Sequence, residues 1–125
     1  MLNSVILIGR LVETPTLSVY DNELSVTTIT LAVGRAFKNH DGEIETDYIR
    51  CVFWDVYAKN VTEYCKKGDC VAVRGRLQSK NSEVVFEKDG ETLKKRIVSL
   101  EVIGERIVFL TPANSKKADF PEVSD

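Results

Sequence analysis

The strict alternation of Cys70–Lys80, CVAVRGRLQSK, constrains the fold of this chain more than any other stretch. In an extended strand, successive side chains point to opposite faces of the sheet. The valines, glycine and leucine of this stretch therefore share one face, and Arg74, Arg76 and Lys80 share the other. The stretch predicts a strand with one core face and one basic face.

Four further stretches have the β-branched and apolar composition of strands, and three of them contain a glycine at which a strand can bend. An Asp-Gly pair precedes the third of these stretches and another precedes the last, and each pair predicts a hairpin turn. Between the third strand and Cys70, apolar residues recur at helical spacing. This order predicts an all-β protein, a five-stranded OB-fold barrel with one short helix between strands three and four. The four stretches are Leu2–Val12, Leu24–Phe37, Thr46–Trp54 and Ile97–Leu110.

The length of 125 residues suits one domain that buries its core without disulfides. We expect residues 1–111 to form the barrel and the short polar segment 112–125 to be a disordered tail. The three cysteines lack the paired spacing of a zinc site, so we expect them to be buried and reduced, with no metal or cofactor. The chain has no apolar run of membrane length and no leader-like start, which predicts a soluble cytoplasmic protein.

Tyr48, Arg50 and Trp54 share the face of the third predicted strand that points away from the core. Unpaired bases expose π faces along a charged backbone, so a general binder of single strands needs aromatic platforms interleaved with cations. The formal net charge of −2 does not exclude such a local basic face. Taken alone, aromatic side chains at this spacing more often pack against a second layer or a subunit, and strand cations more often lie on a solvated edge.

Three stretches carry a resemblance to a known family: MLNSVILIGRL at the start, TDYIRCVFWDVYAKNVTEYCKKGDCVAVRGRL in the middle and EVIGERIVFL near the end. Together they resemble the bacterial single-stranded DNA-binding protein (SSB) family from Met1 to about Leu110. The resemblance implies an OB fold and a homotetramer that wraps single-stranded DNA without sequence preference. It also implies a role in replication, recombination and repair at the bacterial nucleoid, without catalysis.

The resemblance also assigns site residues. The family's base-stacking aromatics fall on Phe37, Tyr48 and Trp54 of this chain. A fourth aromatic would lie near Ser82, where this chain has none, and Phe86 can replace it only if the hairpin register brings it to the same surface. The predicted DNA-binding residues are Phe37, Tyr48, Arg50, Trp54, Arg35, Lys38, Arg74, Arg76, Lys80 and Phe86.

The tail departs from the family, in which a terminal acidic segment ending in Pro-Phe recruits replication and repair proteins. Here Phe120 and Pro121 are internal, so that motif is absent. Two alternatives stay open on the same fold: a dimeric primosome-type accessory protein that acts through protein partners, and a protein-interaction module that does not bind nucleic acid. An enzyme is disfavoured because the single histidine, His40, lies in a predicted hairpin tip.

Overall fold

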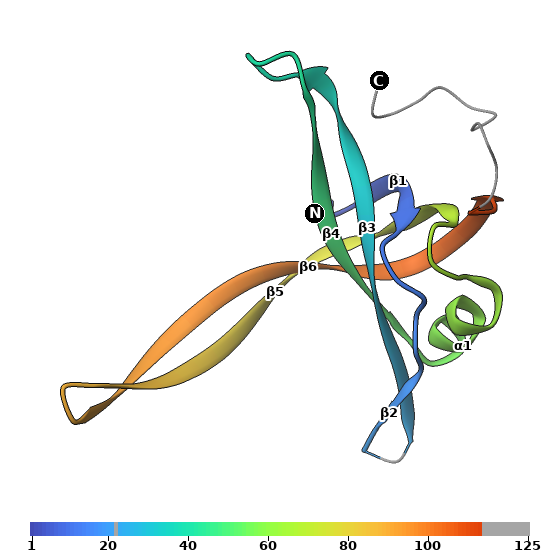
Figure 1. Cartoon of the computed structure of the whole chain (residues 1–125). Coiled ribbons are helices and arrows are strands. Elements are labelled where there is room, and N and C mark those ends of the chain that lie inside the picture. The colour runs from blue at the N-terminus through green and yellow to red at the C-terminus, as the bar shows by residue number, and fades with distance from the viewer. Residues whose placement is uncertain (22, 114–125) are drawn as a thin grey trace.

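The computed structural model describes residues 1–21 and 23–113, which form six strands and one helix (Figure 1). The sequence prediction for the tail therefore lies outside the described residues, apart from residues 112 and 113. Among the residues that the structure describes, no helix has the length and apolar character of a membrane span. The elements are β1 (Val5–Leu11), β2 (Ser18–Tyr20), β3 (Leu24–Lys38), β4 (Ile44–Trp54), α1 (Asp55–Tyr64), β5 (Cys70–Lys88) and β6 (Glu91–Thr111).

Five of the strands close into a barrel in the order β1-β5-β6-β4-β3, and β3 pairs back with β1. The closing contact is short, with Arg10 opposite Ala32 and Leu11 opposite Leu31. The pairs are antiparallel except β4 and β6, which run parallel around Cys51 and Val102. The predicted five-stranded barrel with one short helix is confirmed.

One strand differs from the sequence prediction. Ser18–Tyr20, between the first two predicted strands, forms the short strand β2 on the outer edge of β3. The helix therefore follows the fourth strand along the chain, β4, rather than the third. All three residues of β2 are exposed, so the segment has no buried face whose periodicity sequence reasoning could detect.

The core lies inside the barrel and against α1. Phe53, Val71 and Val73 project into it as the alternating patterns predict, and α1 adds the buried Ala58 and Val61. The three cysteines are buried, as expected. Burial raises the pKa of the Cys51 thiol to about 12, so this thiol stays protonated and unreactive near neutral pH.

Glycines at two places in the sheet set the shape of the barrel. A Cβ on Gly9 would lie 2.6 Å from the carbonyl oxygen of Ala32, so only glycine lets β1 approach β3 and close the barrel. Gly75 and Gly104 face each other where the β5–β6 register shifts, and a Cβ on Gly75 would collide with the backbone of Ile103. The pairing of β6 with β4 ends at Val102, opposite Leu77, so Leu77 lies at the edge of the barrel and is partly exposed although it was predicted on the core face.

Two antiparallel extensions project from the barrel in different directions (Figure 1). One is the β3–β4 hairpin, whose register shifts between Gly34 and Lys38. The other, which we call the arm, is the part of β5 and β6 between Gln78 and Glu101, paired without a break to its tip. Asp89 and Gly90 both have positive φ at that tip, so the predicted Asp-Gly turn is confirmed.

Candidate functional site

A groove lies on the outer surface where β4 faces the base of the arm. Arg50 and Trp54 of β4 line it together with Lys80 of β5, so the fold brings together three of the predicted site residues. The barrel register explains the arrangement. Because Cys51 of β4 lies beside Val102 of β6, Arg50 is level with Glu101, and Glu101 is paired with Gln78 of β5.

The floor of the groove is apolar and its walls are aromatic and charged. Val52 is buried on the same face of β4 as Arg50 and Trp54 and lines the groove between them. Glu101 places one carboxylate beside the two cations, Arg50 and Lys80. An apolar floor between an indole and two cations can accept a flat aromatic group that carries a negative charge nearby.

Tyr20 is the groove residue that sequence reasoning missed. Its ring centroid lies 6.3 Å from that of Trp54, and the two ring planes are perpendicular at 88°. The side chain also lines the groove. The only signal in the sequence was an aromatic residue directly before a turn, which has no special meaning until β2 is known to lie beside β3.

Phe37 and Tyr48 lie on the β3–β4 hairpin and do not line this groove. Both rings are largely exposed, and Tyr48 is opposite Ala32 in the ladder. The alternation predicted for β4 is confirmed, since Cys51 and Phe53 are fully buried while Tyr48 and Arg50 are exposed. Any ligand that contacts both Trp54 and Phe37 must therefore extend along β4 onto the hairpin.

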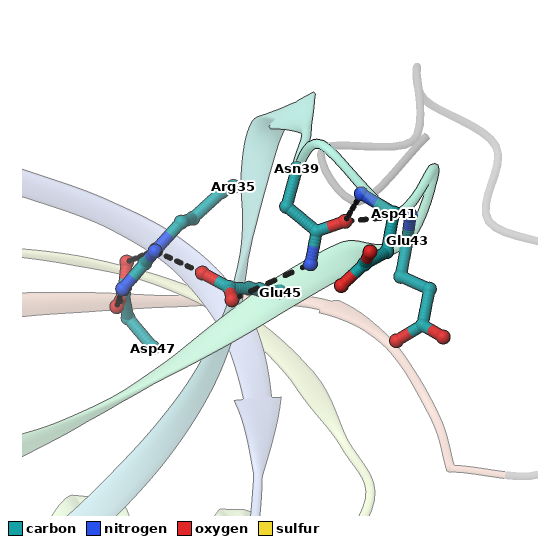
Figure 2. Close-up of polar contacts among 6 residues, drawn as sticks. All are labelled: Arg35, Asn39, Asp41, Glu43, Glu45 and Asp47. Atoms are coloured by element: carbon teal, nitrogen blue, oxygen red, sulfur yellow. Dashed lines mark hydrogen bonds and ion pairs between the residues drawn. The ribbon is translucent and has the colours of Figure 1, made fainter.

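Arg35 is held by carboxylates of the same hairpin (Figure 2). Its Nη2 donates to Asp47 Oδ1 at 2.9 Å, its Nε donates to the same oxygen at 3.1 Å, and its Nη1 donates to Glu45. The hydrogen bond and charge of Asp47 raise the pKa of Arg35, and the guanidinium in turn lowers the pKa of the Asp47 carboxyl. Asp47 and Tyr48 are successive residues of a strand and point to opposite faces, so Arg35 is bound on the face away from Tyr48.

The cations predicted on β5 do not form one patch. Lys80 lines the groove, whereas Arg74 lines a separate hollow with Ile6 and Arg106, its neighbours on β1 and β6. Arg76 is half-buried between these positions, and its Nη1 is buried without a hydrogen-bond partner among the described residues. The shared polar face of β5 is thus divided by the curvature of the barrel. Of the other predicted cations, Lys38 lies opposite Ile44 near the end of the β3–β4 hairpin.

The arm has two chemically different faces, because paired residues of an antiparallel ladder share a face. We call them the Lys80 face and the Glu83 face. On the Glu83 face, Lys94 forms an ion pair with Glu83 at 3.8 Å and Arg96 donates to Asn81. Among the residues that the structure describes, those on the Lys80 face form no ion pair with one another. The register gives this face Gln78, Lys80, Ser82, Val84, Phe86 and Lys88 from β5 and Glu91, Leu93, Lys95, Ile97, Ser99 and Glu101 from β6.

Phe86 meets the condition set by the sequence analysis. It is paired with Leu93 and lies on the Lys80 face, three ladder positions along the same face from Lys80. Its ring is 40% exposed, so a ligand that leaves the groove along the arm can reach it. The position predicted near Ser82 lies on the same face but carries no ring.

Comparisons with known proteins agree with this geometry. The family described as the single-strand binding protein family matches residues 2–110. The single-stranded DNA-binding protein of Bacillus cereus is 47% identical over 114 residues, 91% of this chain and 63% of that protein. Single-stranded DNA-binding protein B of Bacillus subtilis is 38% identical over 118 residues, 94% of this chain and 98% of that protein.

Among solved structures, a deletion mutant of the single-stranded DNA binding protein from Thermus aquaticus matches with a TM-score of 0.66 and 30% identity. The match covers 87% of this chain and 50% of that one. The chain therefore spans less than two thirds of the Bacillus cereus relative and half of the Thermus aquaticus chain, but nearly the whole of the Bacillus subtilis relative.

Proposed function

This chain belongs to the single-strand binding protein family, and from that premise we propose that it binds and protects single-stranded DNA without sequence preference. The proposed setting is replication, recombination and repair in the bacterial cytoplasm, at the nucleoid. Membership of a family of DNA-binding proteins supports the expectation that the chain is not an enzyme.

The observation that carries the proposal is the convergence of Trp54, Arg50 and Lys80 on one groove. A base can stack on the indole while the two cations neutralise flanking phosphates. Stacking contributes about 1–3 kcal/mol per base whatever the base, and cation contacts release counterions from the backbone. Both contributions are independent of sequence, which fits a general binder. The full proposed DNA surface adds Phe37, Lys38 and Tyr48 on the hairpin, Arg76 beside the groove and Phe86 on the arm.

We propose further that the chain assembles as a homotetramer. Support comes from the apolar outer surface of β1, where the exposed Ile6 forms a hollow with Ala72 and Val108. Arg74 and Arg106 border that hollow, so Arg74 fits an interface between subunits better than the DNA surface. Replication and repair proteins are proposed partners. The dimeric primosome-type alternative has no observation in its favour, and the relatives named above are single-stranded DNA-binding proteins.

The test is a titration with oligo-dT monitored by intrinsic fluorescence, because Trp54 is the single tryptophan of the chain. We expect strong quenching at saturation, similar affinities for oligo-dT and a mixed-sequence oligomer, and weak binding of duplex DNA. Light scattering of the same sample should give the mass of four chains. Stoichiometric binding without a change in emission would exclude Trp54 from the site, and the absence of binding would overturn the proposed function.

A further inference from the structure

Tyr20 lies on the same face of the sheet as Trp54, for a reason visible in the ladder. Ser18 of β2 is paired with Val26 of β3, and Val26 is paired with Trp54 of β4, so these three residues share a face. Tyr20 is two residues beyond Ser18 and points to that face too. It therefore meets Trp54 diagonally across β3, which accounts for the perpendicular ring contact at 6.3 Å.

The backbone around Tyr20 is held in place. Tyr20 is paired with Leu24, and its carbonyl accepts a hydrogen bond from Glu23 N–H across the turn. The buried Thr27 donates through its hydroxyl to the carbonyl of Thr16 at 2.8 Å, which ties the segment before β2 to β3. The tyrosine ring is thus presented from a fixed strand rather than from a loose connection.

The pair of rings contributes little to the core. Tyr20 is 57% exposed and Trp54 is 37% exposed, and both line the groove with Arg50 and Lys80. Two aromatic residues that stay this exposed gain little from burial compared with core residues such as Phe53. What the contact does achieve is to restrict the indole, since perpendicular packing is a preferred geometry for aromatic pairs.

We propose that Tyr20 is a positioning residue of the binding site: its ring holds the Trp54 indole in the orientation that receives a base of single-stranded nucleic acid. This inference rests on the proposed function of the groove. Tyr20 acts through Trp54, and the contact is made by the tyrosine ring, so the hydroxyl is not required. A pre-oriented indole does not lose rotational freedom when the base binds. The entropy cost of ordering the side chain therefore offsets less of the stacking energy.

The experiment compares Tyr20→Phe, Tyr20→Ala, Trp54→Ala and the double variant Tyr20→Ala/Trp54→Ala in the full chain. Tyr64→Ala is the matched control, because Tyr64 is an exposed tyrosine of α1 that does not line the groove. Thermal unfolding should be nearly the same in Tyr20→Ala and the control. In the free protein, we expect the Trp54 fluorescence anisotropy to fall in Tyr20→Ala and to stay unchanged in Tyr20→Phe and Tyr64→Ala.

For oligo-dT binding, we expect Tyr20→Ala to raise Kd by about two- to tenfold, the factor that corresponds to one aromatic pair. Tyr20→Phe should bind like the wild type. In the Trp54→Ala background, the same Tyr20→Ala change should have almost no effect. This loss of effect is the signature of action through Trp54, and a general structural role would not produce it.

Two outcomes would overturn the inference. Unchanged anisotropy in Tyr20→Ala would show that Tyr20 does not restrain the indole. If Tyr20→Ala raised Kd in the Trp54→Ala background by the same factor as in the wild type, Tyr20 would contact DNA independently of Trp54. A wild-type chain that does not bind oligo-dT would overturn the proposed function and the DNA role of Tyr20 with it. In that case a fall in anisotropy would still show that the ring contact exists, so the two failures are distinguishable.

Discussion

The β3–β4 hairpin and the arm are both antiparallel extensions of the barrel, but they differ in which of their charged side chains form ion pairs. Each extends an antiparallel pair beyond the barrel and ends in an Asp-Gly turn (Figure 1). Residues 35–47 of the hairpin carry two lysine or arginine side chains and four carboxylates, and Arg35 is bound by two of these carboxylates (Figure 2). The arm instead separates its charges. Ion pairing lies on the Glu83 face, while three lysines and two glutamates lie on the Lys80 face.

This difference shows that a cation near an aromatic residue in the sequence is not thereby available to a ligand. Arg35 is two residues from Phe37, yet its guanidinium is engaged on the opposite face of β4 from Tyr48. Lys80 is far from Trp54 in sequence, yet both line one groove. The availability of a cation depends on the face and the cross-strand neighbours, and these are set by the ladder.

The largest effect is expected where the arm leaves the barrel. Gly75→Ala places a Cβ against the backbone of Ile103, so the free energy of unfolding should fall by about 3 kcal/mol. Gly42→Ala, at the tip of the β3–β4 hairpin, meets no atom within 4 Å and should cost only about 1 kcal/mol for its positive φ. Urea unfolding of both variants checks this. Equal losses would show that the backbone at the base of the arm is free to shift.

The next effect concerns the two faces of the arm. Phe86→Ser should weaken oligo-dT binding by about 1 kcal/mol or more, because it removes an aromatic platform from the Lys80 face. Val85→Ser is the matched control, since Val85 is 57% exposed on the Glu83 face and should leave Kd unchanged. Fluorescence titration measures both. A larger loss for Val85→Ser would mean that the Glu83 face carries the ligand.

The salt dependence of binding compares the cations of the two extensions. Lys80→Gln should flatten the slope of log affinity against log salt by about 0.7, the value for one phosphate contact to a single strand. Arg35→Gln should leave the slope unchanged, because its guanidinium is already neutralised by Asp47 and Glu45. Flattening of similar size in Arg35→Gln would show that these ion pairs open when DNA binds.

The smallest expected effect is on the pKa of one carboxyl of the β3–β4 hairpin, that of Asp47. Arg35 lowers the pKa of the Asp47 carboxyl, so the ion pair is complete above the ordinary aspartate pKa and is lost as pH falls through the lowered value. Arg35→Gln should raise the pKa of Asp47 toward the ordinary aspartate value. Both groups are exposed, so the change in global stability should be slight. NMR titration of the Asp47 carboxyl checks the shift, and an unchanged pKa would contradict the ion pair.

The sequence alone determined the fold class and the inner and outer faces of the strands. Alternation at Cys70–Lys80 and along β4 identified Val71, Val73 and Phe53 as core, because period-two patterning reports which side of a sheet a residue faces. The Asp-Gly pair at Asp89 needed only local backbone preferences to specify a turn. The family resemblance, which is also a property of the sequence, predicts Trp54 on the binding surface, and Trp54 lines the groove.

Only the tertiary structure decided which outward-facing residues meet. In the structure, Arg74 lies in a different hollow from Lys80, and Arg35 is bound to Asp47. Phe86 lies on the Lys80 face of the arm, and Tyr20 packs against Trp54. Alternation gives the side of a strand but not its neighbours across the sheet. Those neighbours follow from strand order, register and the bulges at Gly34 and Gly75, which arise from contacts between segments far apart in the chain.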